Sequence, residues 1–225
     1  MSKLTLITHV YNAQEGVNQQ IEEWRKYSPD LLDQLEFIVI DDYSTPPLLI
    51  DKGNLNLRHF RVNDDIDWNM PGCRNLGAVH AASPWVLYFD VDAITPEKNI
   101  RLMVNNLDAL NPNALHVFNR VHHGVFVEPH INTYLIKRTG FFKAGGYDED
   151  FIKHYGFEDV LFRNMWRRHV GPDILVREIT FYQLGHRTKD LNRDISRNQA
   201  LIQYKAATGF PKPQSLIRFD WTEVS

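Results

Sequence analysis

The sequence predicts an α/β fold with a Rossmann-like, mostly parallel central sheet, helices on both faces and a mixed-sheet extension towards the C-terminus. Short and nearly uninterrupted apolar runs indicate buried strands, and segments with apolar residues at helical spacing separate them. This alternation becomes irregular after about residue 112. We therefore expect one domain over residues 1–225, with a first half over 1–112 and a second half over 113–225.

The first half alternates strands and helices in the order that a parallel sheet requires. Ser28-Pro29 ends the first helix, and Pro71 and Pro96 fall in the first turns of the next two, where a missing N–H is tolerated. In such sheets ligands gather at the carboxyl ends of the strands. We expect strands at about 4–10, 35–40, 57–62 and 85–89, and helices at about 14–27, 70–82 and 94–110.

The second half has weaker periodicity. Phe157, Leu161 and Met165 share one face of a predicted helix, and Gly209 is typical of a helix end. We expect the two halves to share one sheet. The predicted strands lie at about 114–118, 125–127, 133–137 and 180–184, and the predicted helices at about 158–169 and 190–208.

Composition excludes several classes of protein. With 43% hydrophobic and 24% charged residues the chain is typical of a globular protein, and one cysteine, Cys73, cannot build a disulfide framework or a thiolate zinc cluster. A net charge of -3 provides no basic surface for nucleic acid. No apolar run reaches the roughly 18 residues of a membrane helix, and Met1-Ser2-Lys3 leads into a strand, so we expect a cytoplasmic protein without a membrane segment.

The triplet Asp90-Val91-Asp92 follows the apolar run Val86–Phe89, so two carboxylates emerge at a strand end. Hard oxygen ligands in this position suit Mg²⁺ or Mn²⁺, which often bridge substrate phosphates. The alternative is a solvated turn, where aspartate is common.

Two further acidic pairs are candidates. Asp41-Asp42 ends another apolar strand and can accept hydrogen bonds from a base or ribose, or simply form the turn before two prolines. Glu158-Asp159 opens a helix, where acids favour the macrodipole. The same dipole lowers the pKa of a carboxyl group, so a general base at Asp159 requires an opposing effect from burial or from Glu158.

His186 follows a predicted strand and Gly185, and it either completes a metal site with Asp92 or has a structural role. The segment after it is locally basic and either contacts a diphosphate or forms a solvated helix face. Its charged residues are Arg187, Lys189, Asp190, Arg193, Asp194, Arg197 and Lys205.

Five blocks, in this order, resemble the GT-A glycosyltransferases of family 2, the large inverting group that uses nucleotide sugars. The last block is most similar to the carboxyl-terminal module of galactosyl- and N-acetylgalactosaminyltransferases. The blocks are Ile7–Asn12, Phe37–Thr45, Gly72–Ala78, Leu87–Asp92, and Gly145–Glu149 together with Gly156–Asp159.

The resemblance implies a GT-A fold with a nucleotide-binding first half and an acceptor-binding, catalytic second half. It implies a metal-dependent transfer of a hexose or N-acetylhexosamine, most simply from a UDP-sugar, to a hydroxyl of a glycan or other acceptor, with Mn²⁺ or Mg²⁺ as cofactor. The implied roles at the nucleotide sugar are Thr8, Tyr11, Asp42 and Arg74 at the nucleoside, Asp90 at the ribose or sugar, and Trp68 or Tyr155 stacking on a sugar. Asp92, Asp90 and His186 are the implied metal residues. Asp159 is the implied base, and Glu158 orients the acceptor.

Three departures from the family pattern concern specificity. Tyr43 stands where the family often has glycine, Cys73 stands where alanine is usual, and the Trp-Gly-rich approach to the last acidic pair is reduced to His154–Phe157.

Two other function classes remain open. A nucleotidyltransferase normally has a glycine-rich phosphate loop with a lysine after the first strand, and His9–Ala13 has neither. A non-catalytic sugar- or nucleotide-binding relative would retain the fold without turnover.

Overall fold

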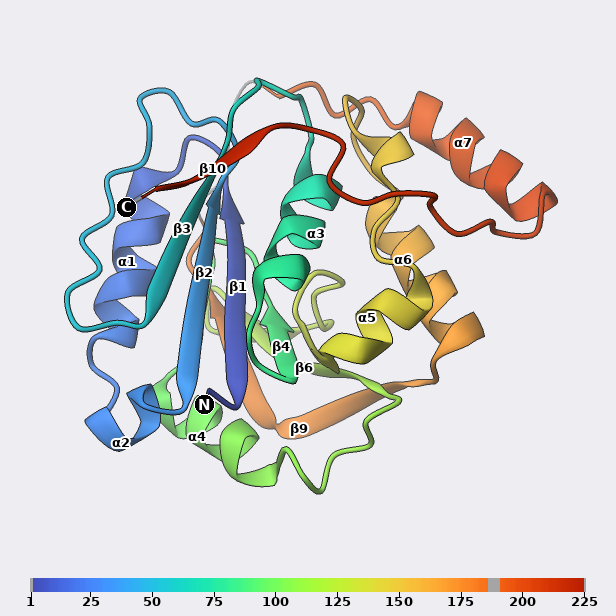
Figure 1. Ribbon diagram of the computed structural model, residues 1–225. Helices are drawn as coiled ribbons and strands as arrows, with labels where there is room; N and C mark the ends of the chain where they lie inside the picture. The colour runs from blue at the N-terminus through green and yellow to red at the C-terminus, as the bar shows by residue number, and fades with distance from the viewer. Residues whose placement is uncertain (1, 186–190, 225) are drawn as a thin grey trace.

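The computed structural model describes residues 2–185 and 191–224, which form a ten-stranded sheet with helices on both faces (Figure 1). The strand order is β10-β3-β2-β1-β4-β8-β6-β9-β5, and β7 pairs with β6. One sheet thus runs through both halves of the chain. The strands are β1 (Leu4–Val10), β2 (Leu35–Asp41), β3 (Leu57–Val62), β4 (Trp85–Tyr88), β5 (Ala93–Ile94), β6 (Leu115–His122), β7 (Val125–Val127), β8 (Tyr134–Lys137), β9 (Asp173–Gln183) and β10 (Trp221–Val224).

The helices cover the sheet in two layers. One apolar core contains side chains of α1, α2 and α4, and a second core on the other face contains side chains of α3, α5 and α6. The helices are α1 (Gln14–Trp24), α2 (Pro29–Leu32), α3 (Met70–His80), α4 (Glu97–Asn106), α5 (Arg138–Ala144), α6 (Glu158–His169) and α7 (Ser196–Ala207), with a 3₁₀ turn at Glu149–Phe151.

The parallel half is the run β3-β2-β1-β4, as the sequence predicts. Its strands are buried on both faces because alternate residues point to opposite sides: Leu6 packs in the first core and Ile7 in the second. Helix α3 lies so close to β1 that a Cβ added at Gly77 would approach Ile7 Cγ2 to 2.5 Å. Glycine at this position permits the close contact between helix and sheet.

The second half forms the expected mixed extension, but its elements differ from the prediction in several places. Helix α7 begins at Ser196 rather than at about 190, and β6 continues to His122, past the predicted residue 118. Strand β9 begins at Asp173, well before the predicted residue 180, because it pairs with β6 on both sides of an irregularity at Phe118/Asn119. Helix α5 and strand β10 were not predicted. Strand β10 pairs antiparallel with β3 at the sheet edge, where Trp221 lies opposite Val62. In the described residues, no helix is long and apolar enough to cross a bilayer.

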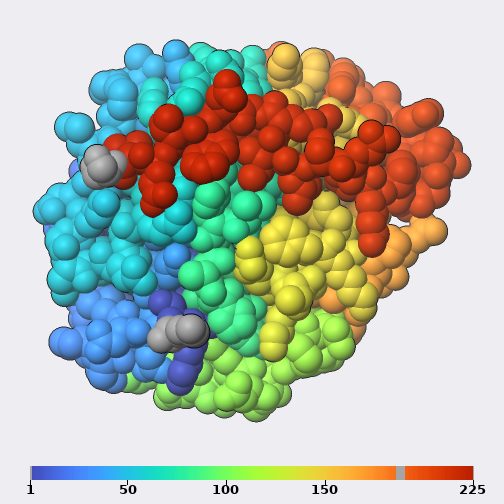
Figure 2. All heavy atoms as spheres, in the orientation of Figure 1, coloured from blue at the N-terminus to red at the C-terminus, as the bar shows by residue number. Residues whose placement is uncertain are grey.

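The C-terminal segment crosses the face of the molecule that carries α3, as Figure 2 shows in red. Buried Glu149 holds it there, because its carboxylate accepts hydrogen bonds from Ile217 N (2.6 Å) and Arg218 N (2.8 Å). Glu149 also accepts from Asn75 Nδ2 over 2.7 Å, and Asn75 Oδ1 accepts from Tyr147 N over 2.8 Å. Two of the five sequence blocks are therefore joined directly through Asn75.

Candidate active site

The carboxyl ends of β1, β2 and β4 and the N-terminus of α6 lie at the upper edge of the sheet in Figure 1. At this edge a cavity collects four of the residues predicted to bind a nucleotide sugar, namely Tyr11, Asp42, Trp68 and Asp90. It also includes residues from other segments. Its full lining is His9, Tyr11, Asp42, Asp67, Trp68, Met70, Asp90, Val91 and Leu191.

Both oxygens of the Asp41 carboxylate accept hydrogen bonds from the protein itself. Its Oδ1 accepts from Ser44 N over 2.7 Å, and its Oδ2 accepts from Leu48 N over 3.2 Å and from Arg61 Nη1. These donors fold the turn after β2 back onto the strand. Asp41 is 0% exposed and is absent from the cavity lining, so its carboxylate is a structural anchor.

Asp42 has the opposite character. It lines the cavity, is 5% exposed, and its buried Oδ1 has no hydrogen-bond partner among the described residues. Burial raises the pKa of Asp42 to about 7, although Cys73 and Asn69 beside it act to lower it. A buried carboxylate with few donors is costly, and Asp42 is the acid of this pair that lines the cavity, so its carboxylate is available to a ligand there.

The turn after β2 explains one departure from the family pattern. Tyr43 has a φ of 59°, in the left-handed region that glycine adopts most easily, and the Arg61 guanidinium lies 5.1 Å from the centre of its ring. Asn12 fastens the turn to the end of β1: its N–H donates to Ser44 Oγ (2.9 Å) and its Oδ1 accepts from Thr45 N (2.7 Å).

Asp90 lies between two cationic or polar donors. Arg74 Nη2 donates to its Oδ1 over 2.8 Å, and His130 Nδ1 is 3.1 Å from its Oδ2. Burial acts to raise the pKa of Asp90, but the hydrogen bond from His130 and the charge of Arg74 outweigh it and hold that pKa below its ordinary value. Asp90 is therefore an ionised carboxylate with both oxygens engaged.

Two buried arginines shape this side of the site. Arg74 Nη1 donates to the carbonyl of Asn132 over 3.2 Å, and Arg163 on α6 donates to the carbonyl of Ile131 from Nε (3.3 Å) and Nη2 (3.1 Å). Together they hold the loop that presents His130 to Asp90. Arg74 was predicted at the nucleoside, but it does not line the cavity and instead contacts Asp90.

Asp92 faces a second, smaller cavity that adjoins the first at Asp90. Its Oδ2 accepts from Gln183 Nε2 over 3.0 Å, and burial raises its pKa. In the described part of the chain no three His, Cys, Asp or Glu side chains are grouped as metal ligands. Magnesium is usually held by one or two carboxylates and completed by substrate phosphates and water, so a single carboxylate at Asp92 fits such a cation.

The N-terminus of α6 brings a third acidic pair to the site. Gly156 (φ 89°) and Phe157 (φ 72°) are both left-handed and turn the chain directly into the helix. Burial raises the pKa of Asp159, and Val160 N, which donates to its Oδ1 over 2.6 Å, opposes this shift. Burial and the Asp159 charge raise the pKa of Glu158 to about 7. The pKa of Asp159 is thus raised by burial, and the charge of Asp90 adds to this shift. Within the pair, the charge of Asp159 acts on the pKa of Glu158.

Trp68 and Tyr155 stack on each other, with ring centres 4.6 Å apart. Trp68 Nε1 donates to the carbonyl of Asn192 over 2.8 Å, and Arg193 lies 5.6 Å from the Trp68 ring centre. The stack joins three distant segments at the mouth of the first cavity. Of the two aromatic residues predicted to meet a sugar, Trp68 lines this cavity.

Among the described residues, Thr8 is a predicted site residue that lies outside this cavity. Thr8 is buried and does not line the cavity, because neighbouring residues of β1 alternate faces and its neighbour His9 points there instead. His186 lies outside the described residues.

The sequence did not predict His9, His130 or Gln183 as site residues. Period-two alternation from Tyr11 would have indicated His9, whereas His130 and Gln183 carry no local signal. Burial and the Arg74 charge lower the pKa of His9 to about 4, so its imidazole is neutral at pH 7.

Comparison with known proteins agrees with this geometry. The family model described as glycosyl transferase family 2 matches residues 5–169. No curated protein matches the sequence. Among solved structures, S. aureus TarS 1–349 is 16% identical with a TM-score of 0.65 over 80% of this chain and 60% of that chain. Its complex with UDP-GlcNAc is 15% identical with a TM-score of 0.66 over 83% and 60%. Its complex with UDP is 17% identical with a TM-score of 0.64 over 80% and 60%.

At these identities the TarS structures show the fold alone, and the chain spans 60% of the length of these TarS chains. They confirm the predicted GT-A-like architecture. The family match covers most of the chain and includes all five sequence blocks and all three acidic pairs. The chain therefore belongs to glycosyl transferase family 2.

Proposed function

We propose that this glycosyltransferase is an inverting, metal-dependent enzyme that moves a hexose or N-acetylhexosamine from a UDP-sugar to a hydroxyl of a glycan or other acceptor. The observation that carries the proposal is the Asp42 carboxylate, which lines the cavity at the strand ends and, unlike that of Asp41, receives no hydrogen bond from a backbone amide or an arginine among the described residues. An ionised carboxylate accepts hydrogen bonds only, so it favours a base with a ring N–H on its pairing edge. Uracil has such a ring N–H, whereas the corresponding ring nitrogen of cytosine is an acceptor and its only pairing-edge donor is the exocyclic amino group. That TarS 1–349 has been solved with UDP and with UDP-GlcNAc supports the choice of nucleotide.

In this proposal Asp92 would hold Mn²⁺ or Mg²⁺, with His186 as a further candidate ligand. When bound, the cation offsets the charge that develops on the departing diphosphate. Asp90, kept ionised by Arg74 and His130, would accept hydrogen bonds from the ribose or sugar hydroxyls.

Asp159 would be the general base. It takes the proton of the acceptor hydroxyl while the acceptor oxygen forms a bond to the anomeric carbon and the bond from that carbon to the UDP oxygen breaks. UDP leaves from the opposite face, so one displacement inverts the configuration. Its raised pKa supports this role, because a base needs a pKa nearer the working pH. Glu158 would orient the acceptor.

The donor assignment is tested by thermal unfolding with UDP, dTDP, GDP and CDP, each with Mn²⁺ and with EDTA. A ligand that binds only the native state raises the midpoint by mass action. We expect a larger rise with UDP and Mn²⁺ than with CDP and Mn²⁺, because the ring nitrogen on the pairing edge is an N–H donor in uracil and an acceptor in cytosine. No shift with any nucleotide, or an equal shift with CDP, would contradict the assignment.

The base assignment is tested with Asp159→Asn, for which we expect turnover to fall about 10³-fold while UDP affinity stays within about twofold. Sugar transfer or slow donor hydrolysis reports turnover, and calorimetry reports UDP binding. Asp108→Asn, an exposed acid distant from the site, is the matched control. Normal turnover in Asp159→Asn would rule out this residue as the base.

A further inference from the structure

Asp92 and the cavity beside it contain a chain of side-chain contacts that the proposed reaction does not yet use. Gln183 Nε2 donates to Asp92 Oδ2 over 3.0 Å, and Arg120 Nη1 donates to Gln183 Oε1 over 3.2 Å. An amide has one acceptor end and one donor end. Because Arg120 engages the Oε1 end, the Nε2 end is directed at Asp92.

Strand pairing sets the positions of these three residues. Gln183 ends β9, where it lies opposite Ala93 of β5, the residue directly after Asp92. Leu184 N also donates to the carbonyl of Asp92 over 2.6 Å. On its other side β9 pairs with β6, which carries Arg120. Three strands thus bring the arginine, the amide and the carboxylate into line, and all three line the same cavity.

The contact leaves Asp92 with unequal oxygens. Oδ2 is occupied by Gln183, and Oδ1 receives no hydrogen bond from another described residue. Each oxygen of the neighbouring Asp90 already has one protein partner, Arg74 or His130, so Oδ1 of Asp92 is the one oxygen of this pair without a side-chain donor among the described residues. A cation at this strand end therefore meets one oxygen of one carboxylate.

One-oxygen coordination discriminates between cations. Mg²⁺ requires a regular octahedron and Mn²⁺ also favours six oxygen ligands, so one carboxylate oxygen, phosphate oxygens and waters satisfy them. Ca²⁺ takes six to eight ligands and gains from carboxylates that bind through both oxygens. Freeing Oδ2 would allow Asp92 to bind through both.

We propose that Gln183, oriented by Arg120, is a positioning residue that restricts Asp92 to one coordinating oxygen and so selects Mg²⁺ and Mn²⁺ over Ca²⁺. This inference rests on the proposed function, which supplies the diphosphate that completes the cation's ligands. It concerns the choice of cation and the strength of cation binding, not the identity of the base or sugar.

The test is calorimetric titration of UDP in the presence of Mn²⁺, Mg²⁺ or Ca²⁺. For the unaltered protein we expect UDP to bind at least about tenfold more tightly with Mn²⁺ than with Ca²⁺. Gln183→Met retains the side-chain length and removes the donor, and loss of such an outer contact costs about 10- to 100-fold in metal affinity. We expect Mn²⁺-supported binding to weaken about tenfold while Ca²⁺-supported binding holds or improves, so the preference for Mn²⁺ disappears.

Variants of Arg120 test whether the orientation of the Gln183 amide, and not only the shape of its side chain, determines the cation preference. Arg120→Met should reproduce the loss of preference, since the amide can then turn its oxygen towards Asp92, and Arg120→Lys, which keeps a donor, should restore most of it. Gln203→Met, on an exposed position of α7, is the matched control. An unchanged ratio of Mn²⁺- to Ca²⁺-supported affinity in Gln183→Met, with normal thermal stability, would overturn the inference.

If UDP does not bind to the unaltered protein in the presence of any of the three cations, the proposed donor is wrong. Mn²⁺ and Ca²⁺ are then titrated without nucleotide, with Mn²⁺ binding followed by electron paramagnetic resonance. Mn²⁺ binding that Gln183→Met weakens would still support the inference, and absence of Mn²⁺ binding would refute it.

Discussion

The ends of β2 and β4 both carry two acidic residues, and each pair is divided in the same way. On β2, Asp41 accepts from two backbone amides and from Arg61, while Asp42 retains a buried oxygen without a partner. On β4, Asp90 lies between two side-chain donors, while Asp92 has one. In each pair one carboxylate is fully engaged by the protein and the other remains available. Two neighbouring acidic residues in the sequence therefore do not supply two equally available carboxylates to a bound cation or nucleotide.

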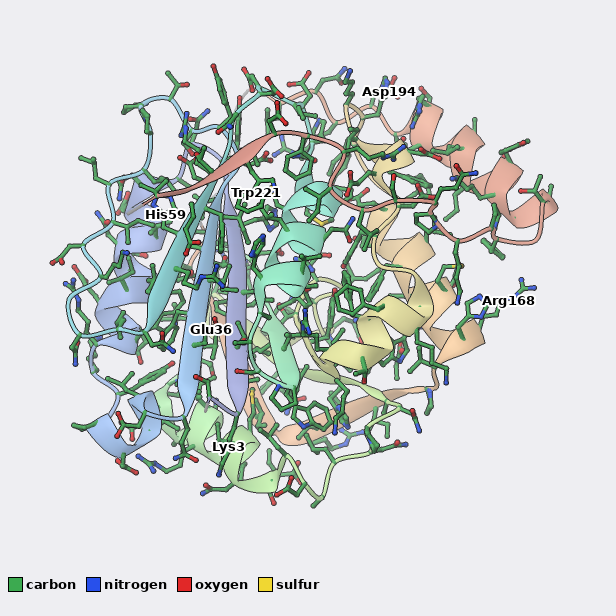
Figure 3. The ribbon with its side chains drawn as sticks, viewed as in Figure 1. Lys3, Glu36, His59, Arg168, Asp194 and Trp221 are labelled. Carbon is green, nitrogen blue, oxygen red and sulfur yellow. The ribbon has the colours of Figure 1, made fainter. Side chains whose placement is uncertain are left out.

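The division arises from where the donors come from. The turn that follows β2 supplies amides to Asp41, the acid that the strand holds at its last position. The donors to Asp90 come from α3 and from the loop between β7 and β8, held by Arg74 and Arg163. Figure 3 shows a third case at the opposite end of β2, where Glu36 points to neighbouring segments. Its buried carboxylate accepts from Thr5 Oγ1 (2.6 Å) and Ala82 N (2.8 Å), which is a purely structural use.

The largest effects should separate Asp41 from Asp42. Asp41→Asn leaves the half-buried Arg61 without its counter-charge, so we expect the free energy of unfolding to fall by about 3 kcal/mol. Asp42→Asn removes a carboxylate that burial disfavours, so stability should change by less than about 1 kcal/mol while UDP affinity falls more than tenfold. Urea denaturation and calorimetry measure the two quantities. If Asp42→Asn proves the more destabilising of the two, the division on β2 is wrong.

A smaller effect should follow from the raised pKa of Asp42. Its folded-state pKa of about 7 lies above its ordinary value of 3.8, so the folded protein holds this proton more tightly than the unfolded chain. The resulting contribution to stability is fully present below pH about 4 and is lost as the pH rises through about 7. UDP requires the ionised form, so its affinity should fall, by up to about tenfold per pH unit, as the pH drops below 7.

UDP titrations at pH 6, 7 and 8 measure this dependence, and Asp42→Asn is the control because it retains every other titrating group. In the variant we expect UDP affinity to vary less with pH, and the remaining dependence to come from titration of the UDP phosphate. Profiles of equal slope in both proteins would show that Asp42 does not govern binding.

How much of this was predictable depends on the range of the interactions. The strands of the parallel half and α6 were predicted nearly to the residue, because apolar runs and helical spacing are local signals, whereas the bounds of α1 and α4 were missed by three or four residues. Strand β10 was missed because a partner far along the chain, β3, makes it a strand: Val224 lies opposite His59, and Figure 3 labels His59 on β3 and Trp221 on β10.

The site divides in the same way. Asp42, Asp90 and Asp92 follow from the rule that strand ends carry ligands. Nothing local marks His130 or Gln183, because a loop and a distant strand deliver them. The family resemblance named Asp42 and not Asp41 as a site residue, but the donors that engage each acid come from distant segments and could not be predicted from the sequence.

The smallest effect concerns the wall of the cavity that loops build rather than strand ends. Trp68→Phe removes the hydrogen bond from Nε1 to the Asn192 carbonyl and leaves a ring to stack on Tyr155. A hydrogen bond of this kind contributes about 1 kcal/mol, so UDP affinity should fall no more than about fivefold. Tyr155→Phe retains the stack and should have no effect on the titration. If Trp68→Phe lowers UDP affinity as much as Asp42→Asn does, donor binding depends on the contact between the loop at Trp68 and the segment at Asn192. The carboxylates of Asp42 and Asp92 at the strand ends would then be secondary to that contact.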